Sequence, residues 1–201
     1  MVDTRVTLKA LTLAFSCFYA TFAPGIAPAQ EAEAPAPELE RDADALLNRL
    51  GTLTAEADAT EANRLANEVL ERWTHSGSAA MDLLLARGTE AIAEGDFPRA
   101  ITHLTALTDH APQFAEGWNQ RATAFFLMDR YGEALSDIEQ VLILEPRHFG
   151  ALAGLGIILE QLGEEKAALK ALKAARQVHP AEENVNDAIE RLEQQTGDRT
   201  L

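Results

Sequence analysis

The sequence contains a repeat of 34 residues, which limits the folds it can adopt. Segments 81–114, 115–148 and 149–182 align without insertion, and five positions then carry the same kind of residue in all three. The 32nd position is always proline, the 20th always alanine, the eighth always glycine or alanine, and the fourth and 24th always large and apolar. A period of this length is typical of a solenoid, in which each unit buries its apolar face against its neighbours.

Each repeat contains two stretches in which apolar residues recur at helical spacing. In the middle repeat the first stretch runs from Trp118 to Phe126 and the second from Leu135 to Leu142, with turn-forming residues 129–132 between them. The proline near the end of each repeat lacks an N–H and disfavours the α conformation in its predecessor, so it ends the second helix. The pattern predicts an all-α solenoid of antiparallel helix pairs.

The small residues at the eighth and 20th positions indicate where the two helices of a repeat cross. We expect these two positions to face each other, because only glycine or alanine lets the backbones approach closely there. On this interpretation Gly154 and Gly156, inside a predicted helix of the third repeat, are packing residues.

The chain resembles the tetratricopeptide repeat family. In the second repeat the residues that carry the resemblance are Trp118, Ala122, Phe125, Ala134, Ile138 and Pro146, and in the third Leu155, Gly156, Leu159, Ala168, Ala175 and Pro180. It covers 102 of the 201 residues and implies a right-handed superhelical solenoid whose first helices line a concave, protein-binding groove. The pattern departs at the seventh position, where Arg87 and Arg121 replace the usual leucine.

The same resemblance implies which residues face the groove, at positions 2, 5, 9, 12 and 13 of each repeat. The predicted peptide-binding residues among them are Leu85, Thr89, Ile92, Asn119, Thr123, Phe126, Leu127, Ile157 and Glu160. None of the fifteen positions holds Lys or Arg, so the basic clamp with which co-chaperone relatives hold acidic chain ends is missing. We therefore expect an apolar or basic partner segment, with Asn119 as a polar contact. The alternative is a groove covered by the N-terminal helices or by a second subunit of a homo-oligomer.

Helical patterns flank the repeats on both sides. Residues 39–80 read as a divergent helical pair packed on the first repeat, with Trp73 in the core of that junction. Residues 183–201 read as a C-terminal capping helix and tail, which covers the last apolar face of the array. Residues 30–38 are rich in Ala, Glu and Pro without a large apolar side chain, so they predict a disordered spacer.

The first 29 residues have the organisation of a secretory signal peptide. Arg5 and Lys9 precede a charge-free run over 10–23, and small residues at 27 and 29 predict cleavage before Gln30. The uninterrupted apolar run is short for a helix that must span a bilayer with about 20 residues. We therefore expect export to the periplasm, with an inner-membrane anchor as the alternative. The bulky Phe15 does not fit the small-residue box that lipid attachment at Cys17 requires.

Composition and motifs restrict the chemistry. The formal net charge of −15 argues against nucleic acid or an anionic membrane surface as a main partner. The single cysteine excludes an intramolecular disulfide framework, and none of the five histidines has metal-ligand spacing. We find no phosphate-binding loop and no serine in a nucleophile-elbow context. The sequence predicts no cofactor, no metal and no enzyme activity.

Together these observations predict an exported, non-catalytic protein-binding scaffold of the bacterial cell envelope. A membrane-anchored adaptor and a non-catalytic subunit of an envelope enzyme complex are the alternatives.

Overall fold

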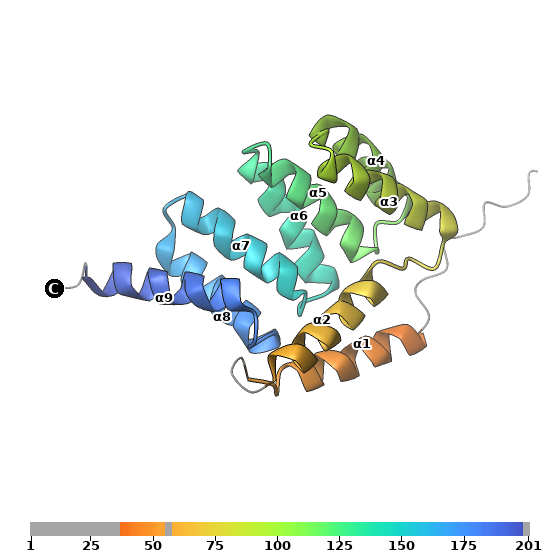
Figure 1. The fold of residues 1–201 in the computed structure, drawn as a ribbon. Helices are drawn as coiled ribbons and strands as arrows, with labels where there is room; N and C mark the ends of the chain where they lie inside the picture. Colours follow the sequence, from red (N-terminus) through yellow and green to blue (C-terminus); the bar gives the residue numbers. More distant parts are fainter. Residues whose placement is uncertain (1–36, 55–57, 199–201) are drawn as a thin grey trace, which may run out of the picture. The chain divides into compact units, whose positions relative to one another are not determined.

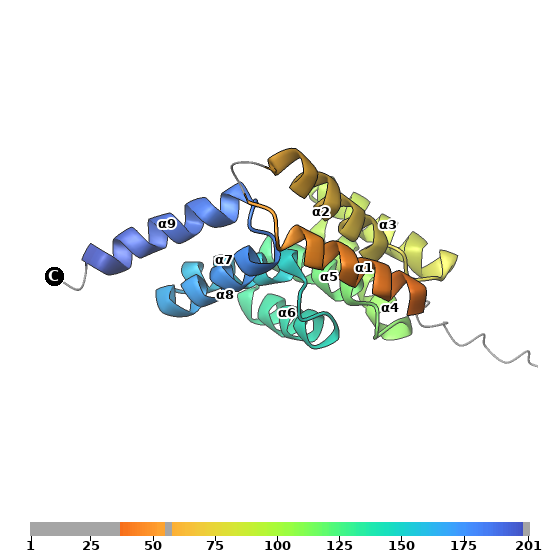
Figure 2. The ribbon, with the colours of Figure 1, turned by 90° about the horizontal axis from the view of Figure 1, so that it is seen from below.

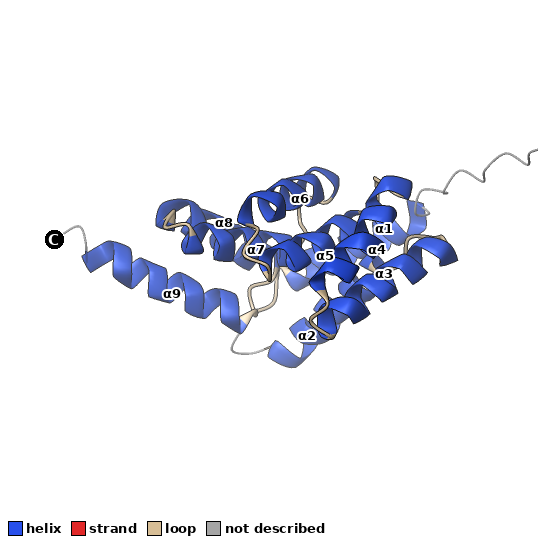
Figure 3. Ribbon diagram, turned by 90° about the horizontal axis from the view of Figure 1, so that it is seen from above, coloured by secondary structure: helices blue, strands red, loops and turns tan. Residues whose placement is uncertain are grey.

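The computed structural model describes residues 37–54 and 58–198. The predicted signal peptide over 1–29 and all of the spacer before Pro37 lie outside the described residues. Every regular element in the described part is an α-helix, which confirms the predicted all-α class (Figure 3). The helices are α1 (Pro37–Leu50), α2 (Ala59–Trp73), α3 (Ala79–Ala93), α4 (Phe97–His110), α5 (Ala115–Phe126), α6 (Tyr131–Leu144), α7 (Phe149–Gln161), α8 (Glu165–Val178) and α9 (Glu183–Asp198).

Three helix hairpins form the repeat array: α3 with α4, α5 with α6, and α7 with α8 (Figure 1). Helices α5 and α7 begin at the first residue of their repeats, 115 and 149. The turn inside each hairpin has a positive φ at the same repeat position, at Gly95 (76°), Asp129 (57°) and Gly163 (78°). Glycine adopts this left-handed conformation without steric cost, and aspartate is among the few other residues that tolerate it.

The helix crossing inside a repeat differs from the prediction in one respect. A Cβ added to Gly88 would lie 2.5 Å from Leu104 Cγ, and one added to Gly156 would lie 2.5 Å from Leu172 Cγ. The eighth position therefore meets the leucine at the 24th position more closely than the alanine at the 20th. Gly154 is not part of this crossing, because an added Cβ would have only Ile138 Cδ1 near it, at 3.7 Å.

The N-terminal pair α1–α2 does not pack on the first repeat as predicted. Its apolar side chains form one core cluster with Phe149 at the start of α7, and Val178 and Ala181 near the end of α8 pack against the same cluster. Arg147, in the loop between α6 and α7, also bonds to Asp44 and Asn48 of α1. The pair thus lies along the edge formed by the loops that join one repeat to the next (Figures 1 and 2).

The last helix covers the open end of the third repeat. The buried stripe Val185, Ile189 and Leu192 of α9 forms one core cluster with residues of α8. Two ion pairs fasten α9 further, Arg191 to Glu160 of α7 at 2.8 Å and Lys173 of α8 to Glu193 at 2.6 Å. Within the described residues, no helix has the length and apolarity needed to traverse a membrane.

Candidate protein-binding groove

A cleft of about 240 Å³ lies between α5 and α7. Four of the predicted binding residues line it: Asn119, Thr123 and Phe126 from α5 and Ile157 from α7. The small residues Gly150, Ala153 and Gly154 of α7 also line the cleft. Gly154 therefore leaves space in the cleft and does not take part in a helix crossing. Ile157 remains 42% exposed, and Leu127, just after α5, remains 45% exposed. The N-terminal pair therefore does not cover these apolar side chains.

The predicted binding residues on α3 lie elsewhere. Leu85 is only 5% exposed and belongs to the core of the first repeat, against which Ile92 also packs. Thr89 is exposed and donates its hydroxyl hydrogen bond to the Leu85 carbonyl at 2.9 Å. None of the three lines the cleft between α5 and α7. The carboxylate of Glu160, the last predicted residue, accepts hydrogen bonds from Arg191.

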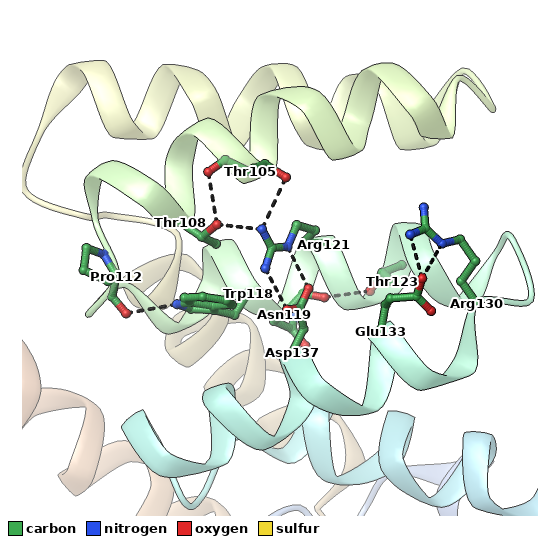
Figure 4. A network of polar contacts seen from close by, with 10 residues as sticks. All are labelled: Thr105, Thr108, Pro112, Trp118, Asn119, Arg121, Thr123, Arg130, Glu133 and Asp137. Atoms are coloured by element: carbon green, nitrogen blue, oxygen red, sulfur yellow. Dashed lines mark hydrogen bonds and ion pairs between the residues drawn. The ribbon is translucent and has the colours of Figure 1, made fainter.

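Asn119 has an internal role that the sequence did not reveal. Its side-chain amide nitrogen lies 3.2 Å and 3.3 Å from the two carboxylate oxygens of Glu116 and donates to them. Its backbone carbonyl accepts the hydroxyl hydrogen bond of Thr123 at 3.1 Å (Figure 4). The side-chain amide of Asn119 is therefore already engaged with Glu116 within α5.

A buried polar pair between repeats, which the sequence pattern does not indicate, lies at the start of the cleft-lining helices. Glu116 at the start of α5 is 4% exposed, and its Oε2 lies 3.1 Å from Nε2 of the fully buried His148. The other ring nitrogen, Nδ1, accepts the backbone N–H of Ala151 and so caps α7. The ring proton must then sit on Nε2, which donates to Glu116. Trp73 of α2 stacks on the His148 ring at 4.2 Å between centroids and closes this pair from the side of the N-terminal helices.

A second buried network explains the arginine at the seventh position of the second repeat. Arg121 of α5 donates two hydrogen bonds of 2.8 Å to Asp137 of α6, and both side chains are largely buried. One guanidinium nitrogen also donates to the hydroxyls of Thr105 and Thr108 on α4 (Figure 4). The cation lies 4.8 Å from the ring centroid of Trp118, within cation–π range. The network ties α4, α5 and α6 together, and no free charge is left in it.

Within the described residues, no group of three or more His, Cys, Asp or Glu side chains is placed so that it could hold a metal ion. A further cleft of about 460 Å³ lies between the N-terminal pair and the inter-repeat loops, where acids and arginines stand side by side. The α5–α7 cleft, by contrast, has no charged residue in its lining.

Stacked helix hairpins with a 34-residue period and an open apolar cleft define a helical-repeat scaffold. Two family profiles, both described as tetratricopeptide repeat, match residues 85–137 and 125–192. A TPR repeat-containing protein of Rhizobium etli is 40% identical over 149 residues, which cover 74% of this chain and 73% of that protein. The chain belongs to the tetratricopeptide repeat family.

More distant relatives share the fold. The yeast small glutamine-rich tetratricopeptide repeat-containing protein 2, from Saccharomyces cerevisiae, is 24% identical over 146 residues, 73% of this chain but only 41% of that protein. The crystal structure of MamA superimposes with a TM-score of 0.55 at 19% identity and covers 80% of this chain and 84% of that one. The first TPR of Spaghetti (RPAP3), bound to the HSP90 peptide SRMEEVD, superimposes with a TM-score of 0.58 at 20% identity and covers 60% of this chain and 95% of that one.

Proposed function

We propose that this protein is a non-catalytic scaffold of the bacterial cell envelope, which binds a protein or peptide segment through its concave face. The observation that carries the proposal is the open cleft between α5 and α7, with Ile157 42% and Leu127 45% exposed beside it. Contiguous exposed apolar side chains in a concave surface are typical of protein-binding sites.

The charges around the cleft favour an apolar or basic partner. No basic side chain lines the cleft, and the nearby Glu160 is already bound to Arg191. The chain as a whole carries a formal net charge of −15, which attracts basic segments and repels acidic ones. An acidic chain end such as the HSP90 peptide bound by the Spaghetti domain would find no cation in this cleft.

The envelope location depends on the signal peptide predicted over residues 1–29. The bacterial relative from Rhizobium etli supports a bacterial setting for the function. The mass of the chain isolated from its native cells tests the location. A protein that starts at Gln30 supports export by cleavage, whereas a retained N-terminus supports the membrane-anchored adaptor.

Site-specific photo-crosslinking in native cells tests the groove. A photoreactive amino acid replaces Ile157 in the full chain, and a matched control replaces Ile143 of α6, which is 66% exposed and lines none of the clefts described. We expect one dominant partner to be linked from position 157 and to be absent from position 143. Ile157→Glu should then weaken the identified complex at least tenfold, while Ile143→Glu leaves its affinity unchanged. Identical products from both positions, or links only between copies of this chain, contradict the proposal.

A further inference from the structure

His179, which follows the last residue of α8, is the anomaly from which the inference starts. The residue is 2% exposed, and of the buried side-chain nitrogen and oxygen atoms in the described residues only its two ring nitrogens have no hydrogen-bond partner. Nδ1 lies 3.3 Å from a carboxylate oxygen of Glu182, outside hydrogen-bond geometry. Buried polar groups are almost always satisfied in native proteins, so an exception requires an explanation.

His148 shows that the fold can satisfy a histidine in this neighbourhood. Both histidine rings pack near Phe149, at centroid distances of 6.4 Å for His148 and 5.3 Å for His179. Both nitrogens of His148 have protein partners, whereas Nε2 of His179 has none among the described residues. The difference therefore belongs to the surroundings of His179.

Those surroundings form a cleft of about 320 Å³ between α7 and α9. Its lining is mainly apolar, with Phe149 at one wall and Val185 of α9 at the other, and His179 and Glu182 supply the ionisable groups. Gly150, Ala153 and Ile157 of α7 line this cleft and also the α5–α7 cleft. The two clefts thus adjoin across α7 within the concave face. An apolar hollow of a few hundred Å³ with a few polar groups is the usual form of a ligand pocket.

The ring has a defined hydrogen-bonding preference. Burial lowers the pKa of His179, so the ring is neutral at pH 7 and carries one N–H and one lone pair. The carboxylate of Glu182 beside Nδ1 favours the proton on that nitrogen. Nε2 is then an acceptor, which a hydrogen-bond donor can satisfy. A carboxylate ligand would be repelled by Glu182.

We propose that the α7–α9 cleft is an anchor pocket for a tyrosine or tryptophan side chain of the bound segment, whose O–H or N–H donates to Nε2 of His179. Such a ring suits an apolar hollow walled by Phe149, and its polar group requires a partner when it is buried. The inference rests on the proposed function, since it assigns part of the sequence of the segment that the concave face binds. It also accounts for the unsatisfied Nε2, because the partner of this nitrogen comes with the ligand.

Three small molecules test the pocket in the full mature chain: p-cresol and 3-methylindole, which are the tyrosine and tryptophan side chains, and toluene, which lacks the donor. We expect the first two to shift the methyl resonances of Ala153, Ile157 and Val185 and to bind about tenfold more tightly than toluene, as one added hydrogen bond predicts. His179→Phe keeps a ring in place, so this variant should bind toluene as before and lose the preference for p-cresol.

Several results would overturn the proposal. These are no shift of the three methyl groups at millimolar p-cresol, equal affinity for toluene and p-cresol, or an unchanged preference in His179→Phe. If His179→Phe does not fold, Ala153→Leu narrows the cleft from α7 and should abolish binding of all three small molecules. A partner linked from position 157 without any fragment binding would overturn the pocket alone. Fragment binding without any linked partner would instead overturn the proposed function, and with it the assignment of the pocket to a protein segment.

Discussion

The second and third repeats fill the space between their two helices with different side chains, a buried ion pair in one and apolar residues in the other. At the seventh and 23rd positions the second repeat has Arg121 and Asp137, which form a buried ion pair at 2.8 Å. The third repeat has Leu155 and Ala171 at these positions, and Ala171 is buried. Both repeats nevertheless fold into hairpins of nearly the same length.

The same helix crossing can thus be filled by an ion pair or by apolar side chains, provided that every buried charge is paired. A buried charge is tolerated only when its partner and its remaining hydrogen bonds are present, and Arg121 obtains them from Asp137 and from the hydroxyls of Thr105 and Thr108 on the preceding repeat. The corresponding residues on the second repeat are Glu139 and Leu142, and they meet no arginine because the seventh position of the third repeat holds Leu155. The polar network is therefore confined to the contact between the first and second repeats.

The largest expected effect comes from breaking the ion pair. Asp137→Ala leaves the guanidinium of Arg121 buried without its carboxylate, and removal of one partner of a buried pair costs about 3–5 kcal/mol. Urea denaturation of the variant should show this loss in the free energy of unfolding.

The matched control gives the second repeat the residues of the third. Because Arg121→Leu combined with Asp137→Ala removes both charges, we expect most of the lost free energy of unfolding to return. A double variant as unstable as Asp137→Ala alone would show that the comparison between the repeats does not hold.

A smaller effect is expected at the eighth position, where the second repeat has Ala122 and the third has Gly156. The Cβ of Gly156→Ala would lie 2.5 Å from Leu172 Cγ, so the leucine must move and overpacking should cost about 1–3 kcal/mol despite the better helix propensity of alanine. Thermal unfolding followed by circular dichroism measures the change. Gly154→Ala is the control, since its new methyl group would have only Ile138 Cδ1 within 4 Å, at 3.7 Å.

The smallest effect concerns the buried His179 and pH. Burial lowers the pKa of His179 in the folded state, whereas the unfolded chain takes up the proton near the ordinary value of about 6.5. Stability is therefore fully present above pH 7 and decreases as the pH falls below about 6.5, until the folded-state pKa is reached. Urea midpoints between pH 7.5 and 5 should fall less for His179→Phe than for the parent chain. Parallel curves for the two proteins would contradict this expectation.

Much of the repeat array could be predicted from the sequence. The 34-residue register gave the starts of α5 and α7, and the proline and turn positions gave the ends of the helices, because both signals are local in the chain. The Arg121–Asp137 pair was missed although a signal existed: the seventh and 23rd positions change together from a charged pair to an apolar pair between repeats. The packing of α1–α2 could not be predicted, since it depends on contacts with residues about 100 positions away and follows no register.

The candidate site was predicted less completely. The register places Asn119, Thr123, Phe126 and Ile157 on one face, and these four do line a common cleft. The register does not predict how much of a side chain is buried. It therefore places Leu85 in the groove, although Leu85 is buried in the core of the first repeat. Nor does it show internal partners: the bond from Asn119 to Glu116 and the buried His148 arise from residues that meet only after the repeats stack.

The position of the N-terminal pair has a mechanical consequence. In an ordinary solenoid each repeat contacts only its neighbours, so the superhelical pitch can change at every joint between repeats. Here α1 is hydrogen-bonded to the α6–α7 loop through Arg147, and the core of the α1–α2 pair includes Phe149 at the start of α7 and packs against Val178 at the end of α8. These contacts bridge the joint between the second and third repeats, so a change of pitch at that joint would have to disturb them.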